Sequence, residues 1–180
     1  NQRLVGSYAE AIQKTRASFS KLAIGIGLAF GAVRRIGSAI SGSIEAFRIQ
    51  EQAVAKSNLV FGDYSKEIQN AASETQKLTT VGDESFISLA AQLKNLGIAQ
   101  EDVIDLTNGV IGLAEKYTTV GLSQEQAAKG VANAMQGNFS TLERYIPELR
   151  TAGSETEKMA ILQRNMADGF DQAKNAAQTG

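Results

Sequence analysis

The hydrophobic positions of residues 5–59 recur at steps of three and four, the spacing of a helix with one apolar seam. One extra step of four near the middle is a stutter, and no proline interrupts the pattern, because the only one in the chain is Pro147. A helix of this length measures roughly 80 Å at about 1.5 Å per residue. The pattern therefore predicts a rod that spans distance or assembles with copies of itself. The seam positions are Val5, Tyr8, Ile12, Thr15, Phe19, Leu22, Ile26, Phe30, Val33, Gly37, Ile40, Ile44 and Phe47.

Small residues accompany this seam at intervals of four, at Ala23, Gly27 and Gly31 and again at Ser38 and Gly42. Such spacing lets helix backbones approach closely, although each interior glycine costs about 1 kcal/mol of helix stability relative to alanine. We predict tight contacts between copies of the chain, and a segment that changes conformation is the alternative. The predicted contact residues are Phe19, Leu22, Ile26, Gly27, Phe30, Gly31, Val33, Gly37, Ile40, Gly42, Ile44 and Phe47.

Beyond residue 60 the pattern changes to short amphipathic helices separated by capping residues and glycines. Asp63 is predicted to cap a helix that runs through about Thr79, and Asp83 a helix that runs through Asn95 before Gly97. Their apolar positions recur at helical spacing. The predicted inner faces are Tyr64, Ile68, Ala71, Ala72 and Leu78 for the first helix, and Phe86, Leu89, Ala90 and Leu93 for the second.

Residues 100–116 carry an apolar stripe wide enough for a central core helix. Capping boxes at Ser123, Ser140 and Ser154 predict three more helices, of which the second stops just before Pro147. The predicted fold class is therefore all-α. It consists of a long glycine-punctuated helix in residues 1–59, which forms a coiled coil or bundle, and a compact domain of about five to six short helices in residues 60–180.

Charge divides the chain in a similar way. Residues 1–48 contain seven Lys or Arg against two Glu, a net charge of +5, whereas the remainder has a net charge of −6. The basic part could face nucleic acid, lipid headgroups or an acidic partner, or it is a solvated helix face. Its apolar run Leu22–Val33 is shorter than the roughly 20 residues of a membrane span, and Arg34 and Arg35 follow directly. We interpret this run as a buried helix.

The composition removes most catalytic chemistry. The chain has no Cys, no His and no Trp, which excludes thiolate and imidazole metal ligands and the commonest general base. The acidic pairs Asp102/Asp105 and Glu155/Glu157 stand at predicted helix starts, where the helix dipole alone favours carboxylates. We therefore predict no catalytic residues, no cofactor-binding residues and no metal site, and a protein that is not an enzyme.

The order of these features resembles the tail tape measure proteins of long-tailed bacteriophages and prophages. The Gly/Ala-rich stretch Gly27–Phe47 reads GLAFGAVRRIGSAISGSIEAF and is followed by two recognisable phrases. One is Gly121–Gly137, GLSQEQAAKGVANAMQG, and the other is Phe139–Ala152, FSTLERYIPELRTA. The resemblance covers most of the chain. Because the chain starts at Asn1 without a Met, we expect an internal piece of a longer protein.

The resemblance implies a structural protein that fills the tail tube lumen and whose length sets the tail length. Its expected partners are other copies of itself, as a trimer or hexamer, together with tail tip or baseplate hub proteins and the tail tube protein. It is expected to be made in the host cytoplasm, to reside in the virion, and to leave the tube during DNA ejection, with contact to the host membrane. The genome lies nearby without sequence-specific binding. A membrane-inserting or pore-forming helical protein acting at the host envelope is the alternative.

Overall fold

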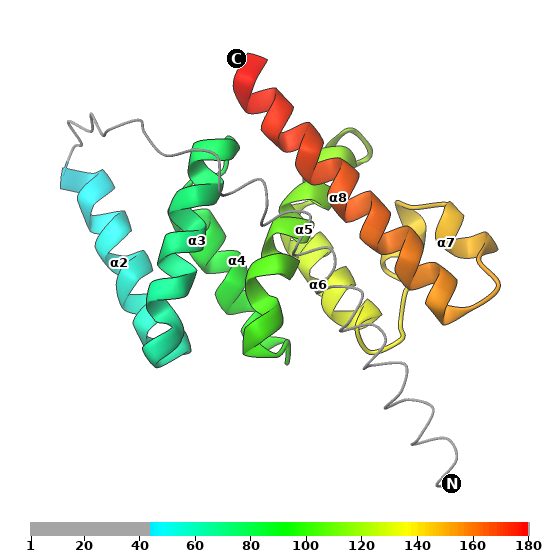
Figure 1. Ribbon diagram of the computed structural model, residues 1–180, viewed down its shortest axis with the longest axis horizontal. Coiled ribbons are helices and arrows are strands. Elements are labelled where there is room, and N and C mark those ends of the chain that lie inside the picture. The colour runs from blue at the N-terminus through cyan, green and yellow to red at the C-terminus, as the bar shows by residue number, and fades with distance from the viewer. Residues whose placement is uncertain (1–43, 180) are drawn as a thin grey trace, which may run out of the picture.

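The computed structural model describes residues 44–179, which are about 81% helical and contain no strand, so the all-α prediction is confirmed for this part of the chain (Figure 1). The predicted helix over residues 5–59 lies outside the described residues except for its last part. The helices are α2 (Ile44–Phe61), α3 (Ser65–Leu78), α4 (Asp83–Asn95), α5 (Val103–Lys116), α6 (Gln124–Ala134), α7 (Glu148–Thr151) and α8 (Glu155–Thr179), with 3-10 turns η1 (Gly62–Tyr64), η2 (Gln100–Asp102), η3 (Thr118–Val120) and η4 (Leu142–Arg144).

Helix α5 is the centre of the described domain, as its apolar stripe predicts. It packs against α4 and α6 and, most extensively, against α8, while α2 and α3 pack on α4 at one end. Figure 1 shows α2 at that end of the molecule and α7 beside α8 at the other. Every residue from Leu106 to Ala114 is buried. The single core also includes Ile68, Phe86, Leu93, Val131, Leu142, Ile146, Leu149, Leu162 and Phe170.

Glycines in the left-handed conformation end several helices. After α4, the amide of Gly97 donates to Lys94 and that of Ile98 to Leu93, with a Gly97 φ of 91°. The same pair of bonds closes α6 at Gly137, where φ is 86°. This is the Schellman arrangement, which satisfies the last carbonyls of a helix. The predicted helix end at Gly97 is therefore confirmed, and α6 ends at Gly137 in the same way.

The predicted helix starts are only partly right. At Ser123 both bonds of the capping box with Gln126 are present, so this start is confirmed. Asp63 does not cap α3, because Gly62 turns the chain into η1 and the helix begins later, at Ser65. Ser140 does not cap a helix either, since Asn138 Oδ1 accepts both its N–H and its hydroxyl. The chain after Ser140 forms the 3-10 turn η4 and then α7.

Helix α2 continues across residue 59, where the sequence predicts a domain boundary. Its inner face packs on α3 and α4. Ser57 and Phe61 are buried and Val54 is half-buried, whereas Leu59 on the outer side is 88% exposed. The end of the predicted rod is thus joined to the helical domain by a packed helix.

Helices α5 and α8 cross with their backbones in contact. A Cβ atom built on Gly169 would overlap the carbonyl oxygen of Gly112, and one built on Gly112 would overlap the carbonyl of Met166. Only glycine therefore fits at these two positions. This crossing fixes the position of α8 and of the segment that precedes it.

Candidate functional site

The predicted contact residues between copies lie almost entirely outside the described part of the chain. Only Ile44 and Phe47 fall within α2, and the structure describes no side chain there before Ile49. The contacts predicted for the seam therefore stay a prediction. The described domain offers three other regions in which polar side chains gather.

The first region is the 138–154 segment, which corresponds to the phrase Phe139–Ala152 and its flanks. Its apolar residues Phe139, Leu142, Ile146 and Leu149 are all buried, although the chain forms only η4 and α7 here. Leu142 lies against Gly130 of α6, where a Cβ would overlap its side chain. Hydrophobic burial thus attaches an irregular segment to α6, the helix of the other recognisable phrase.

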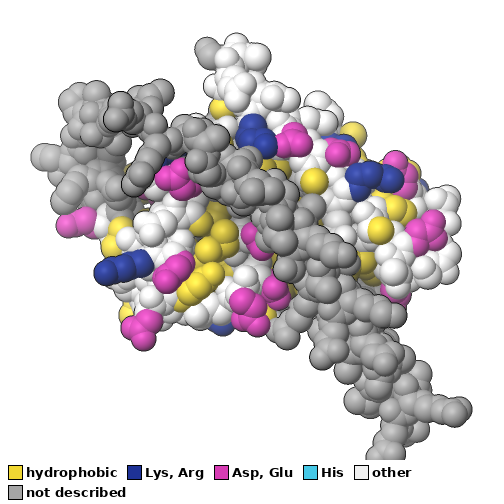
Figure 2. Space-filling model, in the orientation of Figure 1, with side chains coloured by type: hydrophobic (Ala, Val, Ile, Leu, Met, Phe, Trp, Pro, Cys, Tyr) yellow, Lys and Arg dark blue, Asp and Glu magenta, His cyan; other side chains and the backbone are white. Residues whose placement is uncertain are grey.

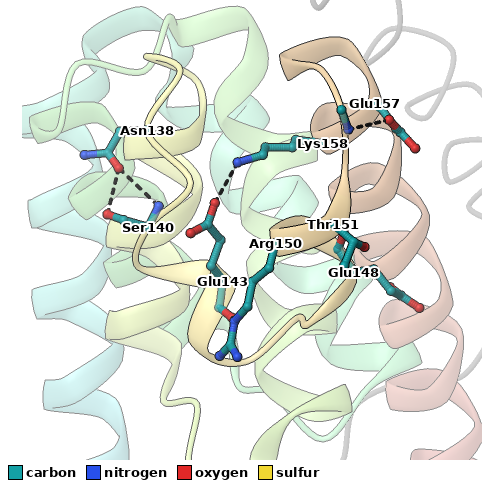
Figure 3. A network of polar contacts seen from close by, with 9 residues as sticks. Asn138, Ser140, Glu143, Glu148, Arg150, Thr151, Glu157 and Lys158 are labelled. Carbon is teal, nitrogen blue, oxygen red and sulfur yellow. Dashed lines mark hydrogen bonds and ion pairs between the residues drawn. The ribbon is translucent and has the colours of Figure 1, made fainter.

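Polar contacts tie the same segment to α8 (Figure 3). Lys158 Nζ donates to Glu143 Oε1 at 2.7 Å, in a pair whose side chains are only 25% and 29% exposed. That ammonium also lies 5.7 Å from the centroid of the Phe139 ring. Arg150 Nε donates to the Glu143 carbonyl at 2.7 Å. Glu143 therefore joins α8 and α7 through its side chain and its backbone.

A second set of hydrogen bonds joins the end of α5 and the start of α7 to the middle of α8. The Tyr117 hydroxyl donates to Asn165 Oδ1 at 2.6 Å, and Asn165 Nδ2 donates to the Ile161 carbonyl at 2.8 Å and to Glu148 at 3.4 Å. Burial, followed by the charges of Glu148 and Asp168, raises the pKa of the Tyr117 phenol. The phenol is consequently a stable donor at neutral pH, as its hydrogen bond to Asn165 requires.

The second region is acidic and lies between η1 and the start of α5. Burial raises the pKa of the Asp105 carboxyl to about 6, and the charge of Asp102 adds to the rise. Burial also raises the pKa of the Tyr64 phenol, and the charges of Glu67, Asp105 and Glu101 add to that shift. The sequence explains Asp102 and Asp105 by the helix dipole alone, and it does not predict that Asp105 faces this surface.

A titrating carboxyl is one part of an acid–base site, and the described groups that interact electrostatically with Asp105 are the acid Asp102 and the phenol of Tyr64. General acid–base or nucleophilic catalysis needs a nucleophile and an orienting group arranged around such a carboxyl. Within residues 44–179 no group of three or more potential metal-ligating side chains is placed to hold a metal ion. The raised pKa of Asp105 supports a local response to pH.

The third region is an open groove of about 570 Å³ that crosses α4 between α2 and the start of α6. Its lining combines two leucines with hydroxyl, amide and charged side chains. Lys56 Nζ donates to Ser88 Oγ across it at 3.3 Å. The lining residues are Lys56, Ser85, Ser88, Leu89, Gln92, Asn95, Leu96, Gln124 and Glu125. Sequence reasoning does not find this groove, because its walls come from segments that lie far apart in the chain.

Charged side chains of both signs stand on the face of the molecule that is drawn in Figure 2. The acidic side chains are scattered over this face as separate groups, and fewer basic side chains stand among them. Several of the bases are paired, as Lys116 is with Asp168 at 3.2 Å and Lys129 with Glu125 at 2.7 Å. A continuous basic stripe, which nucleic-acid binding favours, is not present on the described residues of that face.

Across the described helices, none has both the length and the apolar character needed to cross a membrane. Comparisons with known proteins add no relative. No protein-family model matches the chain, and searches of curated proteins and of solved structures give no match.

Proposed function

We propose that this chain is part of a tail tape measure protein of a bacteriophage or prophage, with a structural role in tail assembly and no catalytic activity. The observation that carries the proposal is the order of three sequence features. A basic, glycine-punctuated stretch, which the sequence predicts to be a rod, is followed by Gly121–Gly137 and then by Phe139–Ala152. The resemblance to tape measure proteins rests on these features and on their order.

The described domain is compatible with this role. It is all-α, and the two phrases become α6 and the buried 138–154 segment, which contact each other through Gly130 and Leu142. In the proposal, residues 5–59 form one long helix, since a helix converts residue number into length at a fixed rate. Three or six copies associate along its seam in the tail lumen, with the tail tip or hub proteins at one end and tube protein around them.

A change of rod length in the intact tail tests the proposal directly. Deleting residues 8–21 removes two heptads and places Leu22 where Tyr8 stood, so the 3–4 spacing of the seam is preserved. We expect tails about 21 Å shorter, from about 1.5 Å per residue. Duplicating the same residues is the matched control, and it should lengthen the tails by the same amount. Averaged electron micrographs of tails from the two variants measure both changes.

Tails of unchanged length in both variants would contradict the proposal. A second measurement separates the alternative function. If the 180-residue chain releases dye from lipid vesicles while tail length does not respond to either variant, the membrane-inserting function is the better account. Light scattering from the same chain measures its copy number, for which we expect three or six.

A further inference from the structure

The groove across α4 has a composition that is complementary to itself. Lys56 stands on its α2 side and Glu125 on its α6 side, and Figure 1 shows α4 between these two helices. The middle of the groove is formed by α4, which supplies the amides Gln92 and Asn95. An amide side chain both donates and accepts hydrogen bonds, so it can pair with a copy of itself.

A two-fold axis through the middle of this groove exchanges its two sides. Lys56 of one copy then faces Glu125 of the other, and the second such pair forms by symmetry. The α4 amides meet their own copies near the axis, where each can donate and accept. Charge and hydrogen bonding are therefore satisfied together by one occupant, a second copy of the same surface.

We propose that this groove binds a second copy of the chain across a two-fold axis. Leu59 follows Lys56 by one helical turn, and its side chain, 88% exposed on the outer side of α2, adds an apolar contact at the rim of the groove, outside the residues that line it. Leu89 and Leu96 are the apolar side chains that line the groove itself, and Leu89 is 6% exposed there. A single leucine that is exposed in the monomer is thereby covered in the pair.

The existing contacts of the two charged residues are compatible with this pairing. Glu125 accepts from Lys129 at 2.7 Å on the surface of α6, and a carboxylate has room for a second donor. Lys56 gives one of its three N–H groups to Ser88. Because the contact is small and rich in polar groups, we expect a weak pair that forms as concentration rises.

Charge reversal provides the test, with sedimentation velocity of the 180-residue chain over a range of concentrations. Lys56→Glu places two acids against each other twice in the pair, and Glu125→Lys places two bases together twice. Each variant should weaken association on the order of tenfold. An equimolar mixture of the two should associate again, since each of the two contacts in a mixed pair then joins an acid to a base.

Three further variants sharpen the result. Leu59→Ser should weaken association without changing helix content, because the side chain is exposed in the single copy. Val120→Ser alters another exposed apolar residue, at η3, and should have no effect. Lys77→Glu makes the same change of net charge as Lys56→Glu but lies on α3 outside the groove, and it too should leave association unchanged.

Several outcomes would overturn this proposal. The proposal is wrong if Lys56→Glu and Glu125→Lys each associate as strongly as the wild type, or if their mixture associates no better than either variant alone. It is also wrong if Lys77→Glu weakens association as much as Lys56→Glu does. The inference does not depend on the proposed function. If a trimer or hexamer forms along the seam and none of these variants changes its association, the groove contact is wrong and the proposed tail role is unaffected. If tail length does not change in the deletion and duplication variants, the tail role is wrong and the groove contact is unaffected.

Discussion

The crossing of α5 with α8 and the attachment of α2 to α3 and α4 are built differently, because the second includes a network of hydroxyl and amide side chains. In the crossing, Gly112 and Gly169 bring two backbones together, and large apolar side chains such as Met166 and Phe170 surround them. At α2, apolar side chains such as Phe61 pack on the core, and a network of hydroxyl and amide side chains joins the helix to α3. Ser57 and Ser65 lie 2.8 Å apart in the interior, and Ser65 also bonds to Asn58 and Gln69.

This difference decides how each junction can fail. A dry, close-packed crossing tolerates no added atom and separates only when the domain unfolds. A junction of hydroxyls and amides can exchange its partners for water at little net cost, because a protein hydrogen bond contributes only about 1 kcal/mol. The molecule thus has a rigid core at α5 and α8 and an adaptable junction at α2, the point where the predicted rod joins the domain.

Alanine at the crossing should have the largest effect. Gly169→Ala drives a methyl group into the Gly112 carbonyl, and because backbone cannot move aside cheaply, we expect the free energy of unfolding to fall by about 3 kcal/mol. Gly109→Ala is the matched control on α5. Its methyl meets the flexible end of Met166, and the gain in helix propensity of about 1 kcal/mol offsets the crowding. Urea unfolding of both variants measures the difference, and equal losses would show that the two backbones are not held in close contact.

Breaking the buried hydrogen bond between α3 and α5 should cause the second largest loss of stability. Thr75 Oγ1 donates to Asn108 Oδ1 at 3.0 Å, and both residues are fully buried, with Asn108 Nδ2 lacking a protein partner. Thr75→Val removes the hydroxyl that donates to this amide and should cost about 2 kcal/mol. Adding Asn108→Leu removes the stranded amide and should recover most of that loss. A double variant less stable than Thr75→Val would mean that the amide is needed for packing and not merely tolerated.

The sequence predicts the elements of this domain better than their contacts. Helix α4 ends at Asn95 as expected, although Gly82 and not Asp83 is its N-cap. The bonds of the Ser123 capping box also form as expected, because they follow from residues within one helical turn. The crossing of Gly112 with Gly169 has no such local signature. Two glycines within helices only lower the predicted helix propensity, and nothing in the spacing says that they meet.

The same reasoning applies to the candidate sites. Asn108 leaves a visible signal, since it interrupts the apolar stripe of residues 100–116, but the sequence does not identify Thr75 as its partner. The groove leaves no signal in the sequence, because Lys56 and Glu125 lie on separate helices that tertiary packing brings to one surface. Ser140 is the opposite case, because the sequence contains a capping signal that the structure does not use. Its capping box is complete in sequence, yet Asn138, two residues earlier, takes its N–H first.

Weakening the α2 junction should have a smaller and more local effect. Ser65→Ala removes the hydroxyl that joins Ser57, Asn58 and Gln69, and we expect a loss of about 1.5 kcal/mol. Hydrogen exchange should quicken in α2 and remain slow in α5, since the core does not depend on this hydroxyl. Ser85→Ala, a change of the same size at a half-buried serine of α4, is the control. Equal acceleration in α2 and α5 would mean that the two regions unfold as one unit.

The smallest effect concerns Asp105, at the start of α5 opposite η1. Its pKa is raised from 3.8 to about 6, so the folded protein holds this proton more tightly than the unfolded chain does. The free energy of unfolding therefore falls as pH rises from about 4 to about 6, and the loss is complete above that window. Asp105→Asn should be about 1 kcal/mol more stable than wild type at pH near 7.5, a figure reduced for the partial exposure of the carboxyl.

Below pH about 4 the two proteins should be equally stable, because the wild-type carboxyl is then protonated in both the folded and the unfolded state. Urea unfolding across this range distinguishes the charge from other effects of the substitution. Asp63→Asn, an exposed change on η1, supplies the control and should leave the pH profile unchanged. If Asp105→Asn is no more stable than the wild type at neutral pH, the positive end of the α5 dipole already stabilises the charged carboxylate. Burial would then not be the main influence on the pKa of Asp105.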